Sequence, residues 1–403
     1  MISKIWSGKA GRILVIKAAG IGDLILAVPA LRALRARFPE AVIDLLVTPK
    51  CVPLLERCLY VDHVFEIPTE GMQNRIVLSE IKPLFHLLRQ LRSRQYDLAV
   101  NLYHLFSRRG AFRFRLLLQV VGAKFSVGRN TDGRGTFYDA AIDDSWEDPA
   151  FASRHEVDLN LDVVRLVGAE DPGEGLAFPV SDKDRSRVAG VLQAGEAGKR
   201  GSLRIVLNPG GDAVYKRWPA EYFASLADRL TERTGAEILI VGSEADRPVV
   251  ERIISEMDHR PVDLAGKLSL PELAALFETC DLVVTNDTGP MHLAVAVGIP
   301  VVALFGPGKP GRYGPYGGEG FHHLLYHPVV CSPCTNFDCR DRDCLWSIRP
   351  EEVLKVVEET VAAGPRAAAA GEGPLVSLRG AEAALPHSNV VEFADRSARH
   401  GVA

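Results

Sequence analysis

The chain has 403 residues, of which 47% are hydrophobic and 24% charged, and its formal net charge is −4, as is usual for a soluble globular protein. This length predicts two domains of roughly 150 to 200 residues, and seven cysteines in so long a chain do not suggest a secreted disulfide scaffold. The first residues lack the apolar core of a signal peptide, and no run approaches the roughly 20 apolar residues of a membrane span. We therefore expect a cytoplasmic protein.

A first series of alternating strands and helices is predicted in the N-terminal half. Gly20-Ile-Gly22-Asp23 forms the turn from the first strand into the first helix. The third glycine of a dinucleotide-binding fingerprint would fall at position 25, which is isoleucine, so a Rossmann-type oxidoreductase is disfavoured. Strands are expected at 12–17, 43–48, 61–67 and 97–102, and helices at 24–38 and 78–94.

Positive charge is concentrated between residues 75 and 134, where twelve Lys and Arg face three Asp and Glu. Within this stretch, residues 106–118 mix arginines with aromatic side chains. Such a mixture is typical of a helix that rests on anionic lipid or another polyanion, and equally of a core helix with a solvated basic face. The stretch could instead serve nucleic acid, but no recognised nucleic-acid-binding module accompanies it.

Turn-forming residues between 171 and 202 predict a passage between two domains, after which a second series of strands and helices begins. In a parallel sheet, the loops that follow the strands share one edge, so they can converge on one ligand. Residues 364–403 are rich in Ala and Gly, and most of them are expected to be poorly ordered. The loops expected to converge are 208–219, 242–244, 285–290 and 306–314.

The most informative stretch starts at Asp281, where a buried strand over 282–285 turns at once into a helix. Pro290 suits the first helical position, Asp287 or Thr288 can cap the helix, and Gly298 can end it. A helix that starts at the carboxyl edge of a sheet presents free N–H donors and about half a positive charge, so it binds anions, often phosphate. Helix capping alone is the other interpretation of these residues.

Five motifs lie along the chain: Gly-Asp23, Lys216-Arg-Trp-Pro219, Gly242-Ser-Glu244, Asp263-Leu-Ala-Gly266 with Leu270-Pro-Glu-Leu273, and Asn286-Asp-Thr-Gly-Pro-Met-His292. Together they resemble glycosyltransferase family nine, the lipopolysaccharide heptosyltransferases, over residues 12–363. The resemblance implies an α/β fold of the GT-B class, in which two Rossmann-like doubly wound domains face each other across a cleft. Residues 1–180 would bind the acceptor and residues 203–363 the nucleotide sugar, with the passage 181–202 between them.

The resemblance also implies the reaction: an inverting, metal-independent transfer of a heptose or related sugar from an ADP-activated donor. The acceptor would be the anionic lipopolysaccharide core or a related surface glycan, reached from the inner face of the cytoplasmic membrane by a peripheral enzyme that needs no cofactor. By match to the family, Asp23 is the general base and Lys216 meets the charge of the departing diphosphate. Helix capping is the alternative for Asp23, and a solvated loop lysine is the alternative for Lys216.

Donor-binding residues are carried over in the same way. Glu244 matches the position that holds the nucleotide ribose, and Asp287 matches a position at the donor diphosphate and sugar, beside the N–H groups of Thr288 and Gly289. His292, one turn into that helix, either reaches the site or packs in the core. The candidate acceptor-binding residues, drawn from the basic stretch, are Arg108, Arg109 and Arg113.

Four cysteines lie within 14 residues near the end of the second series: Cys331, Cys334, Cys339 and Cys344. Four thiolates are enough for a structural zinc, whereas free or reversibly oxidised thiols and an iron–sulfur centre are the alternatives. Asp341-Arg-Asp343 has the spacing of the metal-binding carboxylates of other glycosyltransferases. We set it aside because it lies inside the cysteine cluster, past the last strand.

A non-catalytic protein that binds nucleotide sugars or anionic glycolipids on a degenerate transferase fold is the second functional interpretation. Retention of Asp23, Lys216, Glu244 and Asp287 argues against it. Absence of ADP release with any core acceptor would favour it.

Overall fold

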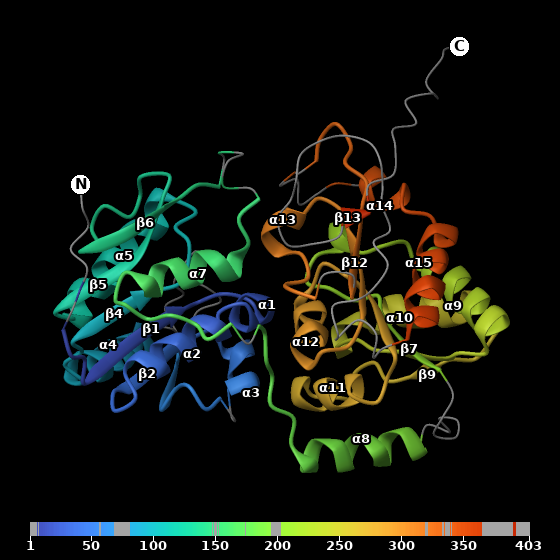
Figure 1. Cartoon of the computed structure of the whole chain (residues 1–403), viewed down its shortest axis with the longest axis horizontal. Helices are drawn as coiled ribbons and strands as arrows, with labels where there is room; N and C mark the ends of the chain where they lie inside the picture. The colour runs from blue at the N-terminus through green and yellow to red at the C-terminus, as the bar shows by residue number, and fades with distance from the viewer. Residues whose placement is uncertain are drawn as a thin grey trace. The chain divides into compact units, whose positions relative to one another are not determined.

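The computed structural model describes residues 6, 8–55, 58–67, 81–146, 148, 151, 153–173, 175–194, 203–318, 321–332, 334, 339, 341–364 and 390–391. The chain divides into two compact units, Met1–Pro179 and Val180–Ala403 (Figure 1). Each unit is built on a parallel β-sheet. Long stretches of its strands are buried, which is the pattern of a sheet covered by helices on both faces.

The N-terminal unit has a six-stranded sheet in the order β3-β2-β1-β4-β5-β6. The strand order reverses between β1 and β4, and this switch point is where open α/β sheets bind their ligands. The strands are β1 (Arg12–Lys17), β2 (Val42–Val47), β3 (His63–Glu66), β4 (Leu98–Asn101), β5 (Phe125–Thr131) and β6 (Ala140–Asp144). The helices are α1 (Ile21–Ile25), α2 (Val28–Arg37), α3 (Val52–Leu55), α4 (Ile81–Ser93), α5 (Arg108–Val121) and α7 (Glu156–Arg165).

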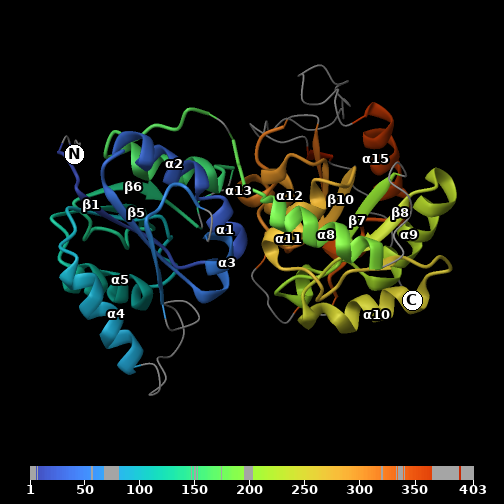
Figure 2. The same ribbon diagram turned by 90° about the horizontal axis from the view of Figure 1, so that it is seen from below.

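Helices α4 and α5 cover one face of this sheet, and α2 lies on the other (Figure 2). Alternation along β1 sorts its side chains between the two layers. Leu14 and Ile16 join the core under α4 and α5. Lys17 points to the opposite layer, where it meets α7, and α7 packs against α2.

The helix predicted over 24–38 is in fact two helices, α1 and α2, separated at Leu26 and Ala27. Pro29 explains the break, because a proline has no backbone N–H and its ring clashes with the carbonyl group four residues earlier, here that of Ile25. The proline therefore sits in the first turn of a new helix. The break makes α1 a short segment that carries Asp23 directly after β1.

The C-terminal unit has a seven-stranded sheet in the order β13-β12-β11-β10-β7-β8-β9, and its switch point lies between β10 and β7. The strands are β7 (Arg204–Asn208), β8 (Glu237–Ile240), β9 (Val262–Asp263), β10 (Leu282–Asn286), β11 (Val301–Phe305), β12 (His322–Tyr326) and β13 (Val390–Val391). The helices are α8 (Asp182–Ala194), α9 (Ala220–Thr234), α10 (Arg247–Glu256), α11 (Leu270–Phe277), α12 (Gly289–Val297), α13 (Pro310–Tyr313), α14 (Asp343–Trp346) and α15 (Pro350–Ala363).

Two segments differ from simple loops. The passage expected over 181–202 contains α8, which packs against α11 and is held by an ion pair of 2.7 Å between Arg185 and Glu278. Residues 195–202 lie outside the described residues. In the C-terminal tail, Val390–Val391 pairs with β12, whereas 365–389 and 392–403 also lie outside the described part.

Candidate active site

Asp23 lies in the first turn of α1, at the switch point of the N-terminal sheet. Its Oδ2 accepts a hydrogen bond of 3.3 Å from the backbone N–H of Gly20, so the carboxylate does cap the helix. This hydrogen bond uses one lone pair of the carboxylate, and the other lone pairs are left to accept the proton of a hydroxyl group. Helix capping and a role as a base are therefore compatible in this residue.

A fully buried polar network lies beneath Asp23, and it was not predicted from the sequence. The Lys17 ammonium donates to the carbonyl of Leu102 and to Glu156 Oε1, both at 3.0 Å. The Arg129 guanidinium donates to Glu156 Oε2 at 2.9 Å and to Asn160 Oδ1 at 2.6 Å. Two cations thus share one carboxylate of α7. The only sequence signal is a lysine at a strand position whose same-face neighbours, Ile13 and Val15, are apolar.

This environment acts on the acidity of Asp23. Burial raises the pKa of the Asp23 carboxyl above its ordinary value of 3.8, and the nearby Glu156 carboxylate raises it further, while Lys17 and Arg129 oppose the rise. A carboxylate with a raised pKa is a stronger base towards a hydroxyl proton than an ordinary aspartate. The N-terminal unit therefore holds a carboxylate suited to accept a proton.

Glu156→Gln is expected to move the acid limb of the pH profile of kcat/KM to lower pH, because it removes a negative charge that raises the pKa of Asp23. It should also destabilise the fold by about 3 kcal/mol, since two buried cations lose their shared carboxylate. A pH–rate profile and thermal melts measure both effects. Asp158→Asn on the same helix is the control and should leave the limb in place. If the acid limb stayed at the same pH in Glu156→Gln, Glu156 would not contribute to the raised pKa of Asp23.

Lys216 is the first candidate site residue of the C-terminal unit. It ends a short 3-10 turn, Val214–Lys216, in the loop after β7, and its ammonium lies 2.6 Å from Asp287 Oδ2. The Trp218 side chain is buried two residues later and donates its indole N–H to the carbonyl of Ile348 at 2.9 Å. Lys216 is thus partnered and held in a fixed loop, which is not the behaviour of a solvated loop lysine.

Asn286 at the end of β10 ties the same loop to the strand beside it. Its side-chain N–H groups donate to the carbonyls of Pro209 and Gly210 at 2.9 and 3.1 Å. Its side-chain oxygen accepts the backbone N–H of Trp218 at 3.0 Å. All of the amide's polar atoms are used in joining the loop after β7 to the loop after β10.

Helix α12 starts at Gly289 with Thr288 as its N-cap residue and ends at Gly298, whose φ of 80° is left-handed, as predicted. The predicted side-chain cap is wrong. The Thr288 hydroxyl makes no cap bond, because it accepts from Asn208 Nδ2 at 3.1 Å, and Asp287 pairs with Lys216 instead. The N-terminus of α12 thus keeps backbone donors that no capping side chain occupies, as an anion site requires.

Glu244 starts a second 3-10 turn, Glu244–Asp246, in the loop after β8 and is exposed. Its carboxylate lies over Gly266, where an added Cβ would come within 2.2 Å of Glu244 Oε2 and where φ is 71°. Asp246, which the sequence did not single out, is buried and accepts from Ser243 and from Arg217, the latter at 2.9 Å. It joins the loop after β8 to the loop after β7.

The four predicted loops therefore do converge at the carboxyl edge of the C-terminal sheet. Arg217 and Asp246 connect the first two, Asn286 connects the first to the third, and in the fourth a Cβ on Gly308 would meet Asp287 Oδ2 at 2.7 Å. His292 is buried within α12, with an exposed fraction of 4%, which supports core packing. Arg108 and Arg109 are exposed in the first turn of α5, and Arg113 is half-buried.

The four cysteines are free thiols that run from exposed Cys331 to buried Cys344. Within the described residues, no three His, Cys, Asp or Glu side chains are grouped so that they could hold a metal ion. Burial, assisted by the other three thiols, raises the pKa of Cys344 to about 11. A structural zinc held by these cysteines stays a prediction, which metal analysis of the purified protein would test.

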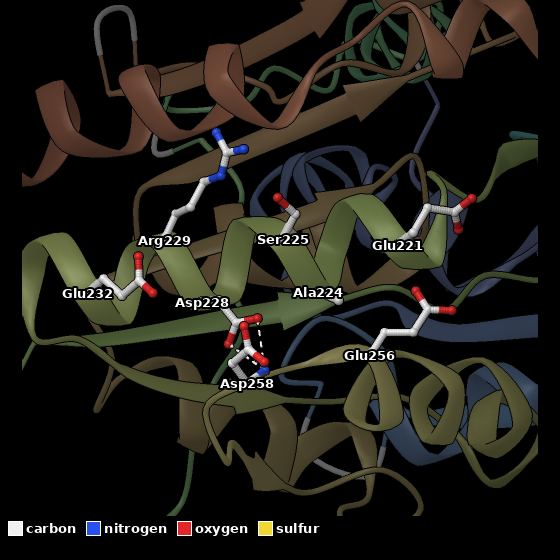
Figure 3. Close-up of a pocket in the computed structure, with 8 residues that line it drawn as sticks. All are labelled: Glu221, Ala224, Ser225, Asp228, Arg229, Glu232, Glu256 and Asp258. Carbon is white, nitrogen blue, oxygen red and sulfur yellow. Dashed lines mark hydrogen bonds between the residues drawn. The ribbon is translucent and has the colours of Figure 1, made fainter.

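A surface pocket of about 460 Å³ lies against α9 and α10 (Figure 3). Asp228 accepts the backbone N–H groups of Asp258 and His259 at 3.0 and 2.8 Å there. Five carboxylates and one arginine line it, so its charge is wrong for a diphosphate. The lining residues are Glu221, Ala224, Ser225, Asp228, Arg229, Glu232, Glu256 and Asp258.

Comparison with known proteins places this geometry in a family. The model of glycosyltransferase family 9 (heptosyltransferase) matches residues 84–343. The chain belongs to this family. Lipopolysaccharide heptosyltransferase 2 of Escherichia coli K12 is 29% identical over 308 residues, which cover 74% of this chain and 84% of the relative. The enzyme of the same name from Salmonella typhimurium LT2 is 30% identical, with the same two shares.

Solved structures of family 9 members agree. A member from Veillonella parvula superposes with a TM-score of 0.69 at 25% identity, covering 88% of this chain and 98% of the other. E. coli heptosyltransferase II gives 0.65 at 23% identity, with 87% and 98% covered. The fold is thus GT-B, with two Rossmann-like doubly wound domains, and the protein is a glycosyltransferase. None of the helices in the described part is long and apolar enough to cross a membrane.

Proposed function

We propose that this family 9 enzyme transfers a heptose from an ADP-activated donor to the lipopolysaccharide core or a related surface glycan, with inversion and without a metal ion. The observation that carries the proposal is the Lys216–Asp287 pair, 2.6 Å apart, at the uncapped N-terminus of α12. Relatives named lipopolysaccharide heptosyltransferase support the sugar and the acceptor. A related E. coli heptosyltransferase has been solved with ADP, which supports the donor nucleotide.

The leaving diphosphate is the chemical problem that the C-terminal site addresses. Negative charge grows on the diphosphate as its bond to the anomeric carbon breaks, and fixed donors that meet this charge are usually the largest catalytic contribution. Lys216 and the N–H groups of Thr288 and Gly289 supply a cation and a helix terminus at one place. This positive charge is the support for a reaction that needs no divalent cation.

The acceptor hydroxyl must lose its proton as it attacks the anomeric carbon from the face opposite the diphosphate, which inverts the configuration. Asp23 would accept that proton, and its raised pKa suits the role. Arg108, Arg109 and Arg113 at the start of α5 would bind the anionic groups of the acceptor. We place the enzyme in the cytoplasm at the inner face of the membrane, where a lipid-linked acceptor would be presented, and propose no role in nucleic-acid binding.

A panel of ADP-, GDP- and UDP-activated heptoses and hexoses, offered with a truncated core acceptor, tests the proposal. Mass spectrometry should detect the acceptor plus one heptose, together with ADP, and only with the ADP-heptose donor. Transfer of a different sugar would replace the donor assignment. If no donor in the panel yields ADP or a product while the protein still binds nucleotide, the non-catalytic interpretation takes its place.

Glu244→Ala is expected to raise KM for the ADP donor by about tenfold and to change kcat little. Glu244 would accept hydrogen bonds from the ribose hydroxyls, and these bonds would be equally strong in the ground state and in the transition state, so their loss affects KM. A hydrogen bond to a charged group is worth about 1.5 to 3 kcal/mol. Steady-state kinetics and calorimetric titration of ADP measure the change. Glu251→Ala, an exposed glutamate of α10, is the matched control. An unchanged KM would separate Glu244 from the ribose.

A further inference from the structure

The outer surface of α4 and α5 carries an unusual number of exposed apolar side chains. Within the described residues, nine large hydrophobic side chains are exposed, and five of the nine belong to these two helices. Phe85 is 69% exposed and Phe112 is 60% exposed. We call this surface the α4–α5 face; its apolar members are Ile81 and Phe85 on α4 and Phe112, Leu116 and Val120 on α5.

These side chains are not the ones that pack the protein core. Leu87 and Leu91 of α4, with Phe114 and Leu117 of α5, are buried against the sheet from the other side of each helix. Both helices are therefore apolar on their inner stripe and partly apolar on their outer one. A surface helix that is apolar on both sides usually has a further partner, since contiguous exposed apolar area is uncommon in monomeric proteins.

The charges on the same two helices are all of one sign. Residues 81–93 and 108–121 contain no Asp and no Glu, and they contain seven Lys and Arg. The two helices lie side by side, and Arg92 Nη1 donates to the carbonyl of Val120 at 3.4 Å, which joins them into one surface (Figure 2). The seven cations are Lys82, Arg89, Arg92, Arg108, Arg109, Arg113 and Arg115.

We propose that the α4–α5 face docks on the surface of an anionic lipid bilayer. Phospholipid headgroups offer phosphates to the cations, and the adjoining acyl region accepts Phe85, Phe112 and Leu116, which is how a basic amphipathic helix lies in a membrane interface. A nucleic acid would pair with the cations, and its bases could stack on the phenylalanines, but it would leave the exposed aliphatic side chains Ile81, Leu116 and Val120 in water. The docking rests on the proposed function for its purpose, because it would bring the enzyme to a lipid-linked acceptor.

The experiment uses the full chain and vesicles of phosphatidylcholine, either pure or with about one third phosphatidylglycerol. Cosedimentation should show binding to the anionic vesicles and little to the neutral ones. Two variants test the face: Phe85→Ser/Phe112→Ser/Leu116→Ser for its apolar part and Lys82→Gln/Arg89→Gln/Arg115→Gln for its charge. Each should weaken binding to the anionic vesicles by at least about tenfold, since attraction of the cations to anionic lipid and burial of the apolar side chains both contribute to binding at a membrane interface.

Matched controls carry the same chemical changes away from the face. Leu59→Ser removes an apolar side chain that is 81% exposed in the loop after α3, and Arg37→Gln removes an exposed charge at the end of α2, on the other side of the sheet. Both should bind vesicles as the natural protein does. Melting curves for every variant confirm that the fold is retained.

The docking surface would be overturned if the natural protein did not bind anionic vesicles, or if the two face variants bound them as tightly as the natural protein does. It would also be overturned if the protein preferred RNA to vesicles and the apolar substitutions left its RNA binding unchanged. Sugar transfer to a delipidated core oligosaccharide, measured in parallel, separates this inference from the proposed function. If the protein binds vesicles through the face but transfers no heptose, the proposed function fails and the docking surface stands.

Discussion

Asp23→Asn is expected to lower kcat for heptose transfer by a hundredfold or more while leaving ADP binding nearly unchanged. General-base assistance typically contributes at least this factor, and an amide cannot accept the hydroxyl proton. Steady-state transfer assays and calorimetric titration of ADP measure the two quantities. Full turnover by the variant would eliminate Asp23 as the base.

The same substitution should make the fold more stable at neutral pH. Asp23 has a pKa above 3.8 in the folded protein, whereas the unfolded chain titrates near that ordinary value. Between those two pKa values the folded state binds more protons, so its stability falls as the pH rises, and above the folded pKa the cost is constant. Asparagine carries no charge and escapes this cost.

Melting curves of Asp23→Asn at low and neutral pH test this sign. The gain over the natural protein should be absent well below the ordinary pKa of 3.8, since both states then hold the proton, and should be fully developed above the folded pKa. Asp97→Asn is the control of opposite sign. A hydrogen bond from Lys124 and others from the backbone N–H groups of Gly11 and Arg12 lower the pKa of Asp97, so its amide should destabilise at neutral pH. Loss of stability in Asp23→Asn at neutral pH would contradict the burial of its carboxylate.

Lys216→Met is expected to reduce kcat by about a hundred- to a thousandfold, the usual effect of removing one group that stabilises developing negative charge. The variant also leaves Asp287 without the cation 2.6 Å away, so an unbalanced carboxylate would face the donor diphosphate and KM should rise. Transfer kinetics at saturating acceptor separate the two parameters. Lys267→Met, an exposed lysine in the same unit, is the control and should behave as the natural protein does.

Combining Lys216→Met with Asp287→Asn distinguishes the two effects. The double variant restores the charge balance, so its KM for the donor should recover toward the natural value, while kcat should stay low because no cation meets the diphosphate. A double variant with both constants restored would show that Lys216 serves only to neutralise Asp287. If the loss of activity in the double variant equalled the sum of the losses in the two single variants, the pair would not act as a unit.

The sheets and the edge at which their loops gather were predictable, because a buried parallel strand has a recognisable local sequence pattern. The runs at β1 and β10 are short, β-branched and bounded by turn residues, and the predicted ranges 12–17 and 282–285 agree with these strands to within a residue. Ser269 and Glu272 have the spacing of a capping box, and the Glu272 carboxylate accepts the backbone N–H and the hydroxyl of Ser269 at 2.7 and 2.8 Å. The convergence of the loops followed from the rule that parallel strands end at one edge.

Long-range polar contacts were not predictable, because no local pattern encodes them. Glu156 and Arg129 are 27 residues apart, and Lys17 and Glu156 are 139 apart, so only the tertiary fold brings the three together. Asp246 is an ordinary helix-start aspartate in sequence, and its pairing with Arg217 appears only when the loops after β7 and β8 meet. Thr288 and Asp287 were expected to cap α12 and do not, for the same reason. They bind Asn208 and Lys216 instead, which are distant in the sequence.

The side chain of Asn286 has a consequence for how the donor binds. Since it joins the loop after β7 to the loop after β10, these two loops are held together before any ligand arrives. Ordering a flexible loop on binding would cost conformational entropy for every residue fixed, and a preorganised site avoids that cost. Affinity for ADP should therefore reflect the contacts themselves, and the backbone amide of Trp218, which donates to the Asn286 side chain, should already be slow to exchange with solvent in the empty enzyme.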